Sequence, residues 1–141
     1  MQPLLLMDAS HMSLVVDRLC HQLIENHDRF SGSAIIGLQP RGIHLASRLV
    51  SHLSELLPGV NVKNGLLDIT FFRDDFRRTG KPLLARDTTI DFSIEGMNII
   101  LVDDVLYTGR SIRAGMEALL EFGRPNKVEL MVFIDRRFSR Q

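Results

Sequence analysis

Residues 99–111 place an apolar run, an acidic pair and a small polar loop in direct succession. The run Ile99-Ile100-Leu101-Val102 is rich in β-branched residues, which is typical of a strand buried on both faces of a parallel sheet. Asp103 and Asp104 follow at once, so we expect their carboxylates at the sheet edge where open α/β folds bind ligands. This succession favours an α/β fold with a site at one edge of its sheet.

A helix is predicted directly after the acidic pair. Residues 112–120 carry apolar residues at helical spacing, and Thr108-Gly109-Arg110-Ser111 precedes them. The loop therefore opens a helix amino terminus, where unpaired N–H groups and the helix dipole favour phosphate. Together with the two carboxylates it suits a phosphorylated sugar. The alternative is a plain strand-to-helix turn with Ser111 as N-cap, but such a turn needs no second carboxylate.

Two other phosphate-binding motifs and one other fold are distinct from this pattern. The chain contains no Gly-x-x-x-x-Gly-Lys-Ser/Thr sequence. A dinucleotide fingerprint needs glycines rather than acids directly after the strand. A signalling receiver domain needs an acidic pair near its first strand, which this chain lacks.

The rest of the chain alternates predicted strands and helices. We expect helices at His11–His27 with Asp8 or Ser10 as N-cap, at 43–57 and at 111–122, and strands at 34–38, 66–72, 99–103 and 128–134. Alternation of this kind predicts a mostly parallel sheet flanked by helices, in one domain spanning residues 1–141.

Residues 73–96 differ from the rest because they are crowded with charges and show little periodicity. So long a segment is unusual for an inert loop. It is either a solvated surface hairpin or a lid that closes over a polyanionic substrate and excludes water.

Composition limits the partners of the chain. Its 17 basic and 17 acidic residues give a formal net charge of zero, so an RNA site would have to be a local patch. Cys20 is the only cysteine, which excludes an internal disulfide, and we expect it in the core of the first helix. The apolar residues 3–7 are too few to span a membrane and lack the basic start of a signal peptide. We therefore expect a cytoplasmic protein without membrane association.

Residues 99–111 resemble the phosphoribosyl pyrophosphate (PRPP) binding motif of type I phosphoribosyltransferases, and the version Val-Asp-Asp-Val-Leu-Tyr-Thr-Gly-Arg is similar to that of the PyrR group. Further likeness lies in residues 37–43, 68–75 and 123–125, in the same order. PyrR proteins regulate pyrimidine operons and also have uracil phosphoribosyltransferase activity. The resemblance implies the type I phosphoribosyltransferase fold with a flexible lid, a dimer or tetramer, and transfer from PRPP to uracil giving UMP in pyrimidine salvage.

The resemblance also implies roles for particular residues. As pyrophosphate leaves PRPP, the ribose becomes partly cationic, by analogy with glycoside chemistry. Asp103 and Asp104 would hold the ribose hydroxyls, with Mg2+ reaching them through PRPP and water. Arg41 and, from the lid, Arg73 would stabilise the leaving pyrophosphate. The expected substrate-binding residues are Gln39, Pro40, Arg41, Gly42, Asp74, Asp75, Asp103, Asp104, Val105, Leu106, Tyr107, Thr108, Gly109, Arg110 and Ser111, of which Tyr107 through Ser111 would anchor the 5'-phosphate.

The sequence departs from the family pattern in two places. Residues 39–42 read Gln-Pro-Arg-Gly, where Lys-Thr-Arg-Gly is common in the PyrR group, so one cation is lost while the arginine and glycine remain. PyrR-like proteins usually continue by some tens of residues that complete the sheet and supply the uracil pocket, whereas this sequence ends at Gln141. We therefore expect that part of the usual domain to be absent, which leaves base specificity to the resemblance alone.

Binding of a pyrimidine operon leader RNA is the second function that the resemblance implies. Where the regulators tend to carry a threonine on the first helix, this chain has Asp17 beside Arg18, and a carboxylate repels phosphate. Arg136, Arg137 and Arg140 form a local basic run, although such runs are often solvated tails. A regulator that senses PRPP or uridine nucleotides and controls transcription attenuation, with little or no catalysis, is the alternative to the enzyme.

Overall fold

A computed structural model describes residues 9–39, 41–69, 88–106 and 110–135. Its elements are α1 (Ala9–His27), β1 (Ser33–Gln39), α2 (Gly42–Leu56), β2 (Lys63–Asp68), β3 (Asn98–Leu106), α4 (Arg110–Leu119) and β4 (Lys127–Asp135). The strands form one sheet in the order β2-β1-β3-β4, and every neighbouring pair is parallel. The predicted parallel sheet flanked by helices is confirmed.

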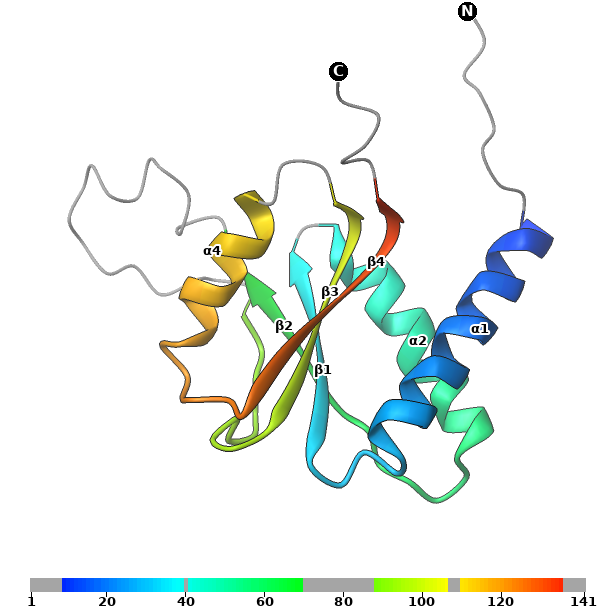
Figure 1. The fold of residues 1–141 in the computed structure, drawn as a ribbon, viewed down its shortest axis with the longest axis horizontal. Coiled ribbons are helices and arrows are strands. Elements are labelled where there is room, and N and C mark those ends of the chain that lie inside the picture. Colours follow the sequence, from blue (N-terminus) through cyan, green and yellow to red (C-terminus); the bar gives the residue numbers. More distant parts are fainter. Residues whose placement is uncertain (1–8, 40, 70–87, 107–109, 136–141) are drawn as a thin grey trace, which may run out of the picture.

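Helices cover both faces of this sheet (Figure 1). α1 and α2 lie on one face, where Ile35, Ile100 and Val102 join the buried residues of both helices. α4 lies on the other face, where Ile36 and Leu101 pack with its buried residues. The central strands β1 and β3 are thus buried on both sides, as their continuous apolar runs predict.

Several predicted boundaries move. α1 begins at Ala9 and contains Ser10, so Ser10 is not an N-cap, and Asp8 lies outside the described residues. β2 begins at Lys63 rather than at 66 and ends at Asp68. The sequence pattern misses the first residues of the strand because they are polar and lie at the border of the sheet. The predicted residues 70–72 of this strand lie outside the described part of the chain.

α4 is shorter than the predicted helix 111–122. It ends at Leu119, and a tighter turn follows in which the N–H groups of Glu121 and Phe122 donate to carbonyls only three residues back. Hydrogen bonds of that span are typical of a 3₁₀ turn at a helix end.

β3 extends beyond the predicted residues 99–103. It runs to Leu106, and Asp103 pairs in the ladder with Val132 of β4. The ladder with β1, in contrast, ends where Gly37 faces Val102. The acidic pair therefore lies inside β3 on the β4 side and beyond the ladder on the β1 side, so the strand contains Asp104 as well as the predicted Asp103.

The predicted lid of residues 73–96 is described only from Thr88 onward. Leu66 and Thr89 exchange two backbone hydrogen bonds of 2.9 and 2.8 Å, and the N–H of Asp68 donates to Thr88 Oγ1 at 2.9 Å. Ile94 is fully buried in the cluster on the α4 face. The carboxyl part of this segment is therefore anchored to the sheet.

Cys20 lies on α1 and packs in the hydrophobic core, as expected. Its side chain is completely buried, and burial raises the pKa of the thiol to about 12. A thiol in such a setting is a small apolar packing residue rather than a nucleophile. No helix in the described ranges is long and apolar enough to cross a membrane.

Candidate active site

The carboxyl ends of the strands and the amino termini of two helices meet at one edge of the molecule (Figure 1). Gln39 at the end of β1 lies opposite Asp68 at the end of β2. α2 begins at Gly42, three residues after β1 ends, and α4 begins at Arg110, four residues after β3 ends. This is the edge at which open parallel sheets bind ligands.

Asp103 and Asp104 form the acidic part of this edge. Asp103 is buried, with an exposed fraction of 6%, and its Oδ1 accepts a hydrogen bond from the Asp104 N–H at 2.8 Å. Burial is the main cause that raises the pKa of Asp103; the hydrogen bond from the Asp104 N–H lowers it, the Asp104 carboxyl group raises it, and the positive charge of Arg41 lowers it. Burial therefore disfavours the charged form of the Asp103 carboxyl group, and the Asp104 N–H and Arg41 counteract that effect in part.

Asp104 presents an unused acceptor. Its Oδ1 is buried and has no hydrogen-bond partner among the described residues. A buried carboxylate oxygen without a partner is unfavourable, so the arrangement suits a hydroxyl donor or a cation that arrives with a ligand.

Gly42 locks the first loop against β3. A Cβ at this position would collide with the Val102 carbonyl oxygen and lie 3.2 Å from the Asp103 Cα, so only glycine allows the two backbones to approach so closely. Arg41 directly precedes it as the N-cap of α2, with φ −93° and ψ −33° and no side-chain cap hydrogen bond. The loop thus carries an exposed arginine to the acidic pair.

The amino terminus of α4 adds a place for an anion. Arg110 and Ser111 stand in its first turn, which contains no acidic residue. Gly115 lets the helix lie close to β1, because a Cβ there would come within 2.9 Å of Leu38 Cδ2. Free N–H groups and the dipole at such an end attract phosphate.

The structure brings together seven of the predicted site residues: Gln39, Arg41, Gly42, Asp103, Asp104, Arg110 and Ser111. Val105 and Leu106 lie in β3. The remaining predicted residues are outside the described ranges: Pro40, Arg73, Asp74, Asp75, Tyr107, Thr108 and Gly109. The roles of all these residues stay predictions.

Two residues of this edge are missing from the sequence-based set. Asp68 is a third carboxylate at this edge and is buried, with an exposed fraction of 6%, and its position directly after the apolar Leu66-Leu67 is a signal that could have found it. Gly37 lets α2 pack closely on β1, because a Cβ there would come within 2.9 Å of Ala46 Cβ. A glycine inside an apolar strand is the signal for such an approach.

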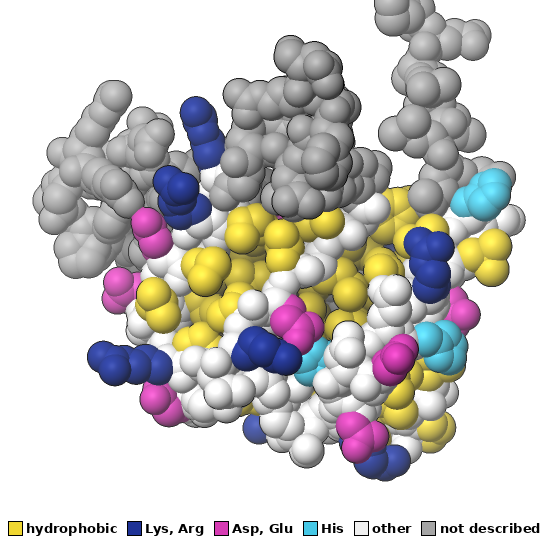
Figure 2. Space-filling view, in the orientation of Figure 1, with side chains coloured by type: hydrophobic (Ala, Val, Ile, Leu, Met, Phe, Trp, Pro, Cys, Tyr) yellow, Lys and Arg dark blue, Asp and Glu magenta, His cyan; other side chains and the backbone are white. Residues whose placement is uncertain are grey.

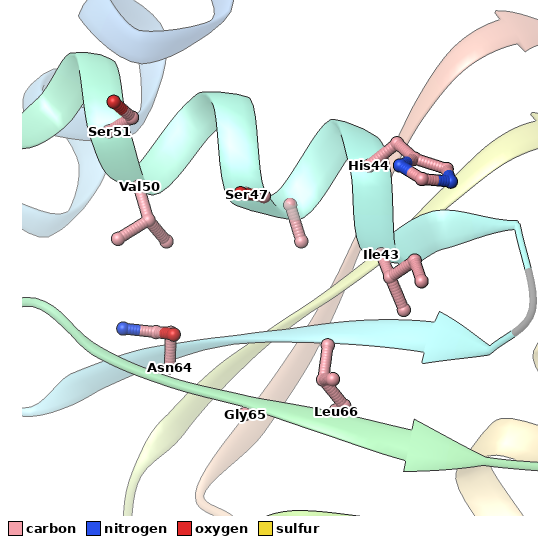
Figure 3. Close-up of a pocket in the computed structure, with 9 residues that line it drawn as sticks. Ile43, His44, Ser47, Val50, Ser51, Asn64, Gly65 and Leu66 are labelled. Carbon is pink, nitrogen blue, oxygen red and sulfur yellow. The ribbon is translucent and has the colours of Figure 1, made fainter. Parts of the chain in front are cut away.

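A groove of about 540 Å³ lies between α2 and β2 (Figure 3). Ile43 and Val50 point from the helix toward the strand, and Leu66 points from the strand toward the helix. None of the predicted site residues lines this groove, so we locate the candidate site at the strand ends rather than here.

Metal binding at the strand ends would need help from a ligand. Within the described ranges, no group of three or more His, Cys, Asp or Glu side chains could hold a metal ion. The adjacent carboxylates Asp103 and Asp104 offer oxygen atoms, which Mg2+ prefers, and Mg2+ is often held by one or two carboxylates together with substrate phosphates and water.

The comparisons with known proteins agree with this architecture. The family model of the phosphoribosyl transferase domain matches residues 6–141. A hypoxanthine-guanine phosphoribosyltransferase from Bacillus anthracis shares the fold with a TM-score of 0.72 and 19% identity over 99% of this chain and 77% of that chain. The corresponding enzyme from Leishmania tarentolae, solved with GMP, gives a TM-score of 0.72 and 14% identity over 100% and 75%. Fold and family model together define a phosphoribosyltransferase domain.

Curated relatives narrow the class. A protein named "Bifunctional protein PyrR" from Deinococcus radiodurans is 43% identical over 131 residues, which are 93% of this chain and 71% of that protein. Its namesake from Elusimicrobium minutum is 41% identical over 132 residues, 94% of this chain and 73% of that protein. The chain belongs to the PyrR group of type I phosphoribosyltransferases, and the resemblance stated from its motifs is confirmed.

Proposed function

We propose that this protein transfers the phosphoribosyl group of PRPP to uracil, giving UMP and pyrophosphate. The observation that carries the proposal is the unpartnered Asp104 Oδ1 beside the buried Asp103, placed between the Arg41 loop and the start of α4. A sugar phosphate has the hydroxyls, phosphate and developing positive charge that such a set of groups complements.

The two ends of the donor would occupy different parts of the edge. The N–H groups and hydroxyls of residues 107–111 would anchor the 5'-phosphate at the start of α4. The ribose hydroxyls would donate to Asp103 and Asp104, whose negative charges also stabilise the ribose as it becomes cationic. Such stabilisation grows as the bond to pyrophosphate breaks, so it lowers the barrier rather than only tightening binding.

Positive charge is needed where pyrophosphate departs. Arg41 would supply it from the α2 loop, and Arg73 would supply it if residues 73–87 close over the substrate. Mg2+ would bind through PRPP, water and the carboxylates of Asp103 and Asp104, and it would neutralise charge on the phosphate oxygens.

The test is pyrophosphate release from PRPP with uracil, hypoxanthine and orotate supplied in turn. We expect turnover with uracil only, and Asp104→Asn serves as the control that removes activity while the fold persists. Turnover with hypoxanthine alone would contradict uracil as the acceptor base. Hypoxanthine is a strict control because the structurally similar proteins include hypoxanthine phosphoribosyltransferases. Failure with all three bases would overturn the enzymatic proposal.

RNA binding is the second proposed function, because the relatives are named bifunctional and because of the surroundings of Asp17. Its Oδ1 lies 2.7 Å from His52 Nε2 and 3.4 Å from His21 Nε2. Imidazoles beside this carboxylate, when protonated, offset the repulsion that it would exert on a nucleic acid.

Binding of the protein to the leader RNA of its own pyrimidine operon tests the regulator. We expect saturable, sequence-dependent binding that weakens with salt and responds to uridine nucleotides. Binding that is equal for a scrambled RNA would overturn the regulatory proposal without affecting the enzymatic one.

A further inference from the structure

α1 and α2 run side by side and border a hollow of about 440 Å³ (Figure 1). Its lining includes three exposed serines, at positions 13, 47 and 51, together with Arg48. Hydroxyl groups and guanidinium groups are donors with which proteins hold the phosphates of nucleic acids. None of the predicted site residues lines this hollow, so it is separate from the candidate active site.

The fixed charges around the hollow do not by themselves favour an anion. Arg48 carries a positive charge, whereas Asp17 and Glu55 carry negative charges. Figure 2 shows Lys and Arg, Asp and Glu, and His side chains interspersed over α1, without a basic patch on the visible face. One fixed positive charge therefore stands against two negative ones, and this balance repels an RNA phosphate unless further positive charge is added.

Two histidines can add that positive charge. His52 Nε2 lies 2.7 Å from Asp17 Oδ1, and His21 Nε2 lies 3.4 Å from the same oxygen. His52 Nδ1 lies 3.4 Å from Glu55 Oε2. In the described part of the chain, Asp17 and His21 on α1 and Arg48 and Glu55 on α2 are thus the charged and titratable groups around His52. With both imidazoles protonated, three positive charges face two negative ones.

Both members of the central pair are open to solvent. The side chains of His52 and Asp17 are 29% and 46% exposed, so protons and a ligand can reach them. The hydrogen bond with Asp17 raises the pKa of His52 above 6.5. His52 therefore takes up its proton at a higher pH than an isolated histidine does.

We propose that proton uptake by His52 converts the hollow between α1 and α2 into a binding site for the phosphate backbone of RNA. Neutral His52 leaves the negative charge of Asp17 uncompensated, and this charge repels phosphate. Protonated His52 neutralises Asp17, and Arg48 and the three serine hydroxyls are then available to hold a phosphate. The switch rests on the proposed binding of RNA and adds the condition under which RNA is bound.

The affinity of the full chain for the leader RNA, measured at about pH 8.5 and at about pH 6, tests the switch. We expect binding to tighten by about tenfold at the lower pH, because one more positive charge faces the RNA. The slope of log affinity against log salt concentration should also steepen, by roughly one phosphate contact.

Three variants separate His52 from the other titrating groups. His52→Gln should lose most of the change with pH, because glutamine keeps a donor for Asp17 but cannot be protonated. Asp17→Asn should bind at about pH 8.5 nearly as tightly as wild type at about pH 6, because the charge that the proton offsets is absent. His44→Gln is the matched control: His44 is exposed on the same helix but lines the groove between α2 and β2, and its substitution should preserve the pH dependence.

The outcomes distinguish the switch from the function on which it rests. Equal wild-type affinity at both pH values would overturn the switch and leave RNA binding in place. A pH dependence that survives His52→Gln but disappears in His44→Gln would also overturn it. Absence of RNA binding at both pH values would overturn the regulatory proposal and the switch together. Thermal melts of each protein at both pH values establish that folded chains are being compared.

Discussion

The two ends of the sheet treat buried polar groups in opposite ways. At the amino end, buried His27 bonds through Nδ1 to Ser33 Oγ at 2.7 Å and through Nε2 to Glu129 Oε2 at 3.0 Å, and its ring stacks on Phe30 at 5.6 Å between centroids. At the carboxyl end, Asp104 Oδ1 is buried without a partner in the described residues. The buried histidine at the amino end has partners for both ring nitrogens, whereas the buried Asp104 Oδ1 at the carboxyl end remains an unused hydrogen-bond acceptor.

The pKa directions of two carboxylates express the same difference. Burial alone would raise the pKa of Glu129, but the hydrogen bonds from Lys127 and His27 outweigh it and hold the pKa below its ordinary value. Burial of Asp103 is not offset in this way, so its pKa is raised. We conclude that the amino end contributes stability, whereas the carboxyl end sacrifices some stability to keep charged groups ready for a ligand.

Asp104→Asn should have the largest effect. Losing a well-aimed charge-stabilising contact costs about 3 kcal/mol in the barrier, so we expect transfer from PRPP to fall by roughly two hundredfold. The melting temperature should stay the same or rise, because the substitution removes repulsion with Asp103. Steady-state assays and thermal melts on the same preparation measure both. A sharp fall in the melting temperature with unchanged specific activity of the folded protein would assign Asp104 to stability.

Arg41→Ala should lower activity by about a hundredfold, less than Asp104→Asn because this side chain is exposed. Removing its positive charge also raises the pKa of Asp103 further, so the acid limb of the pH–activity profile should move to higher pH. Arg41→Lys keeps the charge and should return the limb toward its original position. If the acid limb of the pH–activity profile does not move in Arg41→Ala, the charge of Arg41 does not control the ionisation of Asp103.

His27→Ala should have the reverse profile. It leaves Ser33 and Glu129 without their shared partner and opens a cavity, which we expect to cost about 3 kcal/mol of unfolding free energy. Activity per folded molecule should be unchanged, because His27 lies at the far end of the sheet. Ser33→Ala removes one hydrogen bond only and should cost about 1 kcal/mol. Loss of activity in a fully folded His27→Ala protein would contradict a purely stabilising role for the amino end of the sheet.

His52→Gln should have the smallest effect, and it should depend on pH. The hydrogen bond with Asp17 raises the pKa of His52 above 6.5, and the same bond holds the pKa of Asp17 below 3.8. The stabilising contribution of His52 is fully present below pH 6.5 and is lost as pH rises through its folded-state pKa. The stabilising contribution of Asp17 is lost as pH falls through the lowered pKa of its carboxyl group. Denaturant unfolding of wild type and variant should therefore differ most between pH 4 and pH 6.5, and an equal difference at pH 9 would contradict this.

The sequence predicts the carboxyl end of the sheet, with its acidic pair, better than it predicts the hydrogen bonds of His27 at the amino end. The apolar runs at 34–38 and 99–102 predict β1 and β3, and the motif at 99–111 predicts where the acids gather, because both signals are local. The pairing of His27 with Glu129 joins residues 102 positions apart, and no local pattern announces it. Lys63-Asn64-Gly65 hides the start of β2, since polar residues at a sheet border weaken the strand signal.

The contact between Gly42 and β3 makes the arginine loop and the acidic strand one mechanical unit. Because Gly42 lies in close contact with the β3 backbone, the backbone of Arg41 cannot move away from β3 unless the start of α2 also moves. A ligand that bridges the two segments meets backbones that are already held together, so little backbone conformational entropy is lost in bringing them together. On this view, the affinity for the donor is set largely by the folding of the core, before any substrate arrives.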